Sequence, residues 1–259
     1  MAKKPSEFTV QINARKIKTL VSALSSSIKD ALFQVDSERM YMKALDPSHV
    51  SLAVLSLPAE SFDLFEVEGE VKMPLSLDEL NKYLARARPN DDVTLKHSSS
   101  TSKLEMVYAG GGISTKTFQF PLSRLDMEEA PEPPEMEFDV QISTAADFLA
   151  ELVKDCKVVS PHITLYTEKG KFGAKASESG GTEADFAYSS EGLLSIAVKE
   201  DSKAAYTLQY LEDMAKISAA ADAMHLQFSS DKPLRITFDL IGGGSVTFLL
   251  APRLEPDFS

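Results

Sequence analysis

The chain has a single cysteine, no tryptophan and no long apolar run among its 259 residues. One cysteine, Cys156, cannot form an intrachain disulfide or a metal site built from several thiolates. No apolar stretch approaches the ~20 residues that a membrane helix needs, and no signal-peptide pattern follows the first methionine. We therefore expect an intracellular protein, cytoplasmic or nuclear according to its cell type, with no membrane partner.

Sequence motifs of catalysis are also missing. There is no phosphate-binding loop, and the four histidines are scattered with none at metal-ligand spacing. We predict no enzyme activity, no metal and no cofactor. A hydrolase using Asp46, Ser48 and His49 stays open as an alternative. However, adjacent side chains in an extended segment point to opposite faces, so a turn before the next strand is the better interpretation.

The formal net charge of −12 at pH 7 makes nucleic-acid binding unfavourable for the molecule as a whole. Any role on DNA would require cations gathered on one surface. Six cations lie opposite the apolar stripes of the expected helices, although acidic residues on the same helices make an ordinary mixed surface an equal alternative. These cations are Arg15, Lys18, Lys82, Arg86, Lys154 and Lys216.

The sequence contains an internal repeat. Residues 7–12 read EFTVQI and residues 137–142 read EFDVQI, and the glycine run at 110–112 returns at 242–244. A nearly constant offset of this kind indicates one domain fold written twice. We predict a first domain over residues 1–125, a connecting loop over 126–137, a second domain over 138–255 and a tail over 256–259.

Each half alternates between strand and helix periodicity, which predicts an α+β fold. Asn13 is the expected N-cap of the first helix, and the other helices are predicted over 75–86, 145–157 and 208–221. Strands are expected over 49–57, 66–73, 114–120, 234–240 and 245–250, among others, with further strands between the third helix and residue 199. Both glycine runs are predicted to form hairpin turns.

Three segments carry a family resemblance. Residues 45–52 read LDPSHVSL, residues 249–255 read LLAPRLE, and Leu125, Asp126, Met127 and Glu128 begin the connecting loop. In this order, and over essentially the whole chain, they resemble the proliferating cell nuclear antigen family, the DNA sliding clamps, in an archaeal style. The resemblance implies two tandem clamp domains, with helices lining the interior of a three-chain ring and antiparallel sheets outside.

The resemblance also implies a function. The family's clamps are processivity factors that encircle double-stranded DNA and tether DNA polymerase, flap endonuclease and DNA ligase in replication and repair, after loading by replication factor C. Either a homotrimer or a heterotrimer with sister subunits would fit, as would a specialised or checkpoint-type subunit. A repeat-built scaffold that never touches DNA is a further alternative.

Site residues follow from the same resemblance. Lys18, Lys82 and Lys216 stand where the family places channel lysines. The partner-peptide pocket would use Leu45, His49, Val50, Pro233, Leu249, Leu250, Ala251 and Pro252, although core packing is an alternative role for Leu250. Ring closure would pair two strands of neighbouring chains through Thr115, Thr117, Phe118 and Phe120 on one side and Ala184, Phe186 and Tyr188 on the other.

The connecting loop departs from the family pattern. Apolar residues usually follow its first four positions, whereas this chain has Glu129, Ala130, Pro131 and Glu132 there, followed by two more prolines. Prolines keep such a segment extended and charge keeps it solvated. We expect an altered partner preference.

Overall fold

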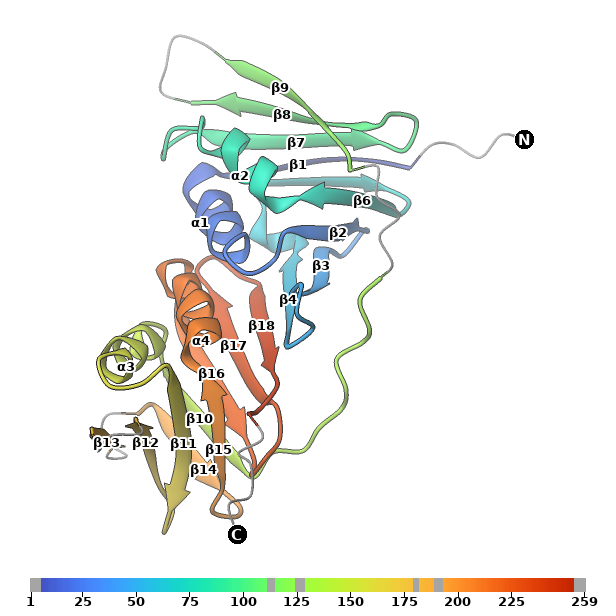
Figure 1. The fold of residues 1–259 in the computed structure, drawn as a ribbon. Helices are drawn as coiled ribbons and strands as arrows, with labels where there is room; N and C mark the ends of the chain where they lie inside the picture. Colours follow the sequence, from blue (N-terminus) through green and yellow to red (C-terminus); the bar gives the residue numbers. More distant parts are fainter. Residues whose placement is uncertain (1–5, 111–114, 124–128, 179–181, 189–192, 254–259) are drawn as a thin grey trace. The chain divides into compact units, whose positions relative to one another are not determined.

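The computed structural model describes residues 6–110, 115–123, 129–178, 182–188 and 193–253 (Figure 1). The chain divides into two compact units. The first comprises Met1–Pro47, Ala53–Pro131 and Ile241–Ser245, and the second comprises Ser48–Leu52, Glu132–Leu240 and Val246–Ser259. Each unit contains helices and antiparallel strands, so the predicted α+β class is confirmed.

The first unit begins with strand β1 (Glu7–Asn13) and helix α1 (Ala14–Leu24). Five strands, with a short 3-10 turn at Ala59–Ser61, lead to helix α2 (Leu77–Leu84), and three more strands follow it. The strands between the helices are β2 (Asp30–Val35), β3 (Arg39–Leu45), β4 (Ser51–Pro58), β5 (Leu64–Glu68) and β6 (Val71–Ser76). The last three are β7 (Asp92–Ser98), β8 (Lys103–Ala109) and β9 (Lys116–Pro121).

The second unit begins with β10 (Val140–Ala145) and α3 (Phe148–Lys157). Its second helix, α4 (Leu208–Ala215), continues as a 3-10 helix over Lys216–Ala220. Between the helices run β11 (His162–Glu168), β12 (Lys171–Ser177), β13 (Glu183–Tyr188), β14 (Ser195–Val198) and β15 (Lys203–Thr207). After them come β16 (Ala221–Phe228), β17 (Leu234–Leu240) and β18 (Ser245–Leu250).

Strand order shows the duplication in three dimensions. In the first unit the hydrogen-bonded order is β5-β1-β7-β8-β9, and in the second the matching strands follow the order β14-β10-β16-β17-β18. The remaining strands run β6-β2-β3-β4 in the first unit and β15-β11-β12-β13 in the second. Both units therefore use the same topology, and the internal repeat predicted from the sequence corresponds to a repeated fold.

The helices of each unit pack as a pair against its strands, as Figure 1 shows. The apolar stripe of α1 is buried at Ile17, Leu20, Val21 and Leu24, and that of α2 at Leu77, Leu80 and Leu84. In the second unit Leu149, Leu152 and Cys156 of α3 and Leu211 and Met214 of α4 are buried in the same way. The exposed charged residues of α1, α2 and α3 lie away from these stripes.

Three predicted helices are longer than the observed ones. Residues 75 and 76 belong to β6 because that strand pairs with β2 as far as Ser76. Ala145 likewise ends β10, which pairs with β16 at Ala223. The fourth helix tightens into a 3-10 turn at Lys216, and this change of phase buries Ile217 and leaves Ser218 only half-buried. Sheet pairing therefore overrides the helical pattern at the element ends.

Turns account for two further differences. The strand predicted over 66–73 is two strands, β5 and β6, separated at Gly69, whose φ of 75° few other residues adopt. The strand predicted from residue 49 begins at Ser51, because His49 has a φ of 58° in the preceding turn. Gly242, Gly243 and Gly244 all have positive φ in the β17–β18 turn, as a hairpin turn requires, whereas residues 111 and 112 of the other run lie outside the described residues.

Among the described residues, no helix has the length and apolar character needed to cross a membrane.

Candidate nucleic-acid interface and partner surface

The first helix presents its cations from a well-defined start. The side chain of Asn13 accepts a hydrogen bond from the backbone nitrogen of Arg15 at 2.9 Å, which confirms the predicted N-cap. The cap sets the phase of α1, so that Arg15 is exposed on the face opposite Ile17 and Leu20. The sequence pattern alone places this arginine correctly.

Two other cations of α1 are occupied within the first unit. Lys18 donates from Nζ to the carbonyl oxygen of Ala87 at 2.8 Å, and it is half-buried. Lys16 donates to the carbonyl oxygens of Gly242 and Gly243 at 3.0 and 3.2 Å. Burial lowers the pKa of Lys16, while nearby Asp63 acts in the opposite direction. Of the cations of α1, only Arg15 extends freely from the helix.

Helix α2 and the turn after it add two exposed cations. Lys82 lies in the last turn of α2, and Arg86 lies just after the C-cap residue Ala85. Among the described residues, no hydrogen bond or ion pair engages the side chain of Arg15, Lys82 or Arg86. The helical side of the first unit therefore carries three exposed cations with no direct polar partner, alongside the exposed carboxylates of Asp78 and Glu79 in the first turn of α2.

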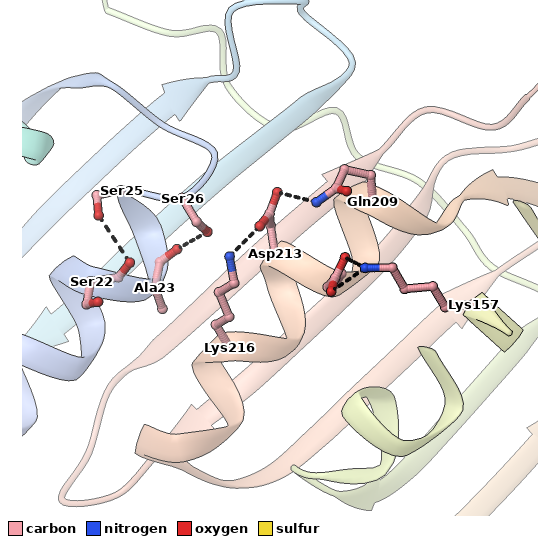
Figure 2. A network of polar contacts seen from close by, with 9 residues as sticks. Ser22, Ala23, Ser25, Ser26, Lys157, Gln209, Asp213 and Lys216 are labelled. Carbon is pink, nitrogen blue, oxygen red and sulfur yellow. Dashed lines mark hydrogen bonds and ion pairs between the residues drawn. The ribbon is translucent and has the colours of Figure 1, made fainter. Parts of the chain in front are cut away.

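The second unit is different, because its carboxylates lie beside its lysines (Figure 2). Lys216 forms an ion pair with Asp213 at 2.6 Å, and Asp213 also accepts from the Gln209 amide at 3.4 Å. Lys157 contacts the carboxylate of Glu212 at 2.7 Å. Only Lys154 of the predicted channel cations in this unit is exposed with no polar partner among the described residues. Sequence spacing alone could not reveal this neutralisation.

A hollow of about 770 Å³ lies over the five-stranded sheet of the first unit, and another of about 670 Å³ lies between α3 and α4. The second hollow has an alanine- and valine-rich floor, with Val158 86% exposed, and Lys154, Lys157 and Lys216 at its rim. This cationic rim lies on the helical face rather than on the strands.

Most of the predicted partner pocket lies on the second unit. The backbone nitrogen of Ala251 donates to the carbonyl oxygen of Val50 at 2.9 Å, so two distant segments meet there. His49 and Ala251 are exposed, and Val50, Pro233 and Pro252 are half-buried. Leu249 is buried at 7% exposure and Leu250 at 1%, so Leu250 belongs to the core and cannot offer its side chain to a partner.

Leu45 belongs to the first unit, on the outward face of β3. Lys43 lies two residues earlier on that face, and its side chain is only 3% exposed. It forms an ion pair with Glu129 at 3.6 Å, and Lys72 approaches the same carboxylate at 3.5 Å. A hydrogen bond from Gln34, together with Lys72 and Lys43, lowers the pKa of Glu129. Sequence reasoning missed this contact because its residues come from three strands and the connecting loop.

The start of the connecting loop, Leu125, Asp126, Met127 and Glu128, lies outside the described residues. Glu129 is thus the first described residue after it, and the two lysines hold it against the sheet of the first unit. The described loop backbone from there to Phe138 contains no helix or strand.

Both strands predicted for ring closure lie at the end of a sheet: β9 ends one sheet and β13 ends another. An end strand has backbone donors and acceptors that can pair with another chain. Thr115 and Thr117 are exposed, and Phe118 is half-buried against Tyr83, with ring centroids 5.8 Å apart. The side chain of Phe120 is 0% exposed and packs edge-on against Tyr83 in the core, which leaves only its backbone available for the predicted strand pairing.

Ala184, Phe186 and Tyr188 alternate along β13 and are all half-buried. Tyr188 stacks on Phe172 with ring centroids 5.5 Å apart and meets Phe148 at 4.9 Å. These side chains face the second unit's interior, so the outward positions of β13 are Glu183, Asp185 and Ala187. Any pairing through this edge would use its backbone more than those three predicted side chains.

The structure does not support the alternative of a hydrolase that uses Asp46, Ser48 and His49. Asp46 is buried in the first unit, whereas Ser48 and His49 are exposed in the second. A hydrogen-bonded Ser143–His225–Asp239 chain does exist on the second unit, with both contacts at 2.8 Å. Ser143 lies on β10, which pairs with β14 and β16 on its two sides, so neighbouring strands already use its backbone amides. Such amides are not free to stabilise an oxyanion.

Comparison with known proteins extends over the whole described chain. The family model described as proliferating cell nuclear antigen, N-terminal domain, matches residues 8–130, and the corresponding C-terminal domain matches residues 132–253. The chain is 34% identical over 244 residues to the DNA polymerase sliding clamp of Thermococcus fumicolans, covering 93% of this chain and 96% of that protein. Identity and coverage are the same for the DNA polymerase sliding clamp of Pyrococcus furiosus.

Solved structures agree with this comparison. The structure of a proliferating cell nuclear antigen from Thermococcus kodakaraensis superimposes with a TM-score of 0.86 at 31% identity, covering 95% of this chain and 100% of that one. A complex of two such proteins from Sulfolobus tokodaii gives a TM-score of 0.86 at 24% identity, covering 95% of this chain and 100% of that chain, and shows the same fold.

Proposed function

Because the chain belongs to the proliferating cell nuclear antigen family, we propose that it is a DNA sliding clamp that encircles duplex DNA and catalyses no reaction itself. The observation that carries the proposal is the placement of exposed cations. Arg15, Lys82 and Arg86 all lie on the helical side of the first unit, although the chain as a whole has a formal charge of −12. A surface of this kind attracts the phosphate backbone without reading sequence.

Ring geometry is compatible with this role. Three chains with four helices each would supply twelve helices. At a spacing of ~10 Å, their axes would form a ring with a circumference of ~120 Å and a diameter of ~38 Å. After about 5 Å is subtracted on each side for the helix radius, an opening of roughly 28 Å remains, which admits duplex DNA. End strands β9 and β13 would join neighbouring subunits by backbone pairing.

The partners would be DNA polymerase, flap endonuclease, DNA ligase and the clamp loader, replication factor C. Their peptides would dock near His49, Val50, Ala251 and Pro252, which are at least partly exposed on the second unit. A clamp that holds such an enzyme on DNA raises its local concentration at the substrate, which is an avidity effect rather than catalysis.

A specialised clamp subunit is the second candidate, and one observation favours it. The connecting loop begins its described course with Glu129 held by Lys43 and Lys72, and it continues with three prolines and further glutamates. This polar loop would suit a narrower set of partners than an apolar one. A ring of different subunits would allow such a division of roles.

Two measurements test the proposal. The mass of the purified chain, alone and with sister subunits, should correspond to a three-subunit ring. Primer extension on primed circular DNA, with polymerase and clamp loader present, should give longer products when the chain is added. Products of unchanged length in every subunit combination would refute the clamp function.

Replacement of Ala251 and Pro252 tests the partner surface separately. The double variant should keep the ring mass but lose binding to polymerase or ligase. Retention of that binding would remove the partner role from these two residues while leaving the clamp function intact.

A further inference from the structure

Four residues of the second unit form a network across three neighbouring strands. Tyr166 of β11 donates from its hydroxyl to Oδ1 of Asp185 on β13 at 2.6 Å. Lys175 of β12 approaches Oδ2 of the same carboxylate at 3.2 Å, and its Nζ lies 5.3 Å from the centroid of the Tyr166 ring. The network links the inner strand β11 directly to the end strand β13.

Gly173 makes this reach possible. It lies opposite Tyr166 in the β11–β12 pairing, and the tyrosine ring passes over it. A Cβ at this position would lie 2.3 Å from Cζ of Tyr166, closer than any real contact. The φ of Gly173 is not in the left-handed region, so the position requires glycine for space and not for backbone conformation.

The network holds the outward side of strand β13, whose inward side is already packed. Among the named strands β13 pairs with β12, and Tyr188 holds the inward side against Phe172 and Phe148. Asp185 is the central outward residue of β13, and it is tied to both β11 and β12. Without that tie, the outward side would depend on backbone hydrogen bonds to β12.

We propose that Tyr166, Gly173, Lys175 and Asp185 form a cross-strand brace that holds β13 flat and in register for pairing with strand β9 of a second clamp subunit. The inference rests on the proposed ring function, in which β13 is a closing strand. The four residues act as positioning residues, because they order the strand and need no contact with the incoming chain. Ordering the strand in advance removes part of the entropy cost of association.

Protonation states suit the brace at neutral pH. The bond to Asp185, with burial and the nearby carboxylates, raises the pKa of Tyr166 to about 12, so the phenol remains a donor. The same bond and Lys175 lower the pKa of Asp185, so its carboxylate remains an ionised acceptor. Charge-assisted hydrogen bonds of this type are shorter and stronger than neutral ones.

The test uses Tyr166→Phe and Asp185→Asn in the full chain. Tyr166→Phe removes the hydroxyl donor, whereas Asp185→Asn removes the negative charge and one of the two acceptor oxygens; both keep the side-chain volume nearly constant. Asp239→Asn is the matched control, because it breaks a carboxylate contact to His225 on a different sheet. Hydrogen exchange over residues 183–188 should be faster in both brace variants and unchanged in the control. Unchanged exchange in both brace variants would overturn the proposal, whether or not the chain assembles.

Association provides the second readout. Sedimentation should show about five- to tenfold weaker ring assembly for each brace variant, equivalent to the loss of about 1–1.4 kcal/mol. The free energy of unfolding of the full chain in denaturant should stay near wild type, which separates a positioning role from general destabilisation. Wild-type assembly in both variants would refute the brace.

The variant Ala187→Pro distinguishes an error in the proposed brace from an error in the proposed ring closure through β13. Proline removes a backbone donor from β13 and should abolish strand pairing there. If Ala187→Pro still forms rings, then β13 does not close them, and the proposed ring closure and the brace fail together. If it prevents assembly while Tyr166→Phe and Asp185→Asn assemble normally, only the brace is wrong.

Discussion

DNA contact should depend mainly on the first unit of the chain. Replacement of Arg15, Lys82 and Arg86 by glutamine removes three exposed cations that have no polar partner among the described residues. In the second unit Lys157 and Lys216 are already paired with Glu212 and Asp213, so they contribute little net charge. We therefore expect an asymmetric response to charge removal in the two units.

The magnitude follows from counterion release. Each phosphate that a cation neutralises contributes about 0.9 to the slope of log affinity against log salt concentration. Loss of three contacts should lower that slope by at most about 2.7 for each subunit of the ring that carries the substitutions. The charge-neutral pair of replacements Lys216→Gln with Asp213→Asn should leave it unchanged, because it removes one charge of each sign.

Fluorescence anisotropy of a labelled duplex, titrated at several salt concentrations, measures these slopes directly. A matched triple variant replaces Arg39, Lys96 and Lys103, three exposed cations on strands, and thereby removes the same total charge. This strand variant should change the slope far less than the replacement of Arg15, Lys82 and Arg86. Equal slopes for the two triple variants would show that the helices are not the DNA-binding surface.

Three other outcomes can be measured. Asn13→Ala should lower the free energy of unfolding by about 1 kcal/mol in denaturant titrations, because the cap of α1 is lost; an unchanged midpoint would contradict the cap's role. Phe120→Ala should cost about 3–5 kcal/mol, as expected of a core cavity rather than an interface residue; loss of assembly at unchanged stability would contradict this assignment. The pKa of Glu129 is lowered by Gln34, Lys72 and Lys43, so its contacts are complete above the ordinary glutamate pKa of about 4.3 and are lost as pH falls through the lowered value. Backbone protection at residue 129, measured by hydrogen exchange and corrected for the intrinsic pH dependence, should fall on acidification, and Glu129→Gln should abolish that dependence.

Local patterns predicted much of the fold. The hydrophobic pattern located β17 and β18 at their observed bounds, and Asn13 marked the start of α1, whereas the bounds of β13 came from the family resemblance. These features depend on residues a few positions apart, whose side chains share a face because of backbone geometry. Helix ends were less accurate, because pairing with distant strands decides whether residues such as Ser76 and Ala145 join a strand.

The candidate site residues also divide into those that local pattern placed correctly and those whose contacts or burial depend on the tertiary structure. Helical phase correctly placed Arg15, Lys82 and Lys154 on exposed faces. It could not show that Lys216 pairs with Asp213, since a long side chain three residues from a carboxylate can also extend into solvent. The resemblance named Phe120 and Leu250 as contact residues, with core packing kept as an alternative for Leu250, and the side chains of both are buried in the folded chain.

The amino-acid sequence alone determined the duplication, which two matching halves of the chain reveal. It also determined the order of strands and helices and the exposed cations of the first unit, because these follow from short-range spacing along the chain. Tertiary structure decided which cations are neutralised, which end-strand side chains are buried and how Tyr166 reaches Asp185 across Gly173. Those features depend on strands brought together from distant positions, and their contacts are set by sheet register rather than by local sequence.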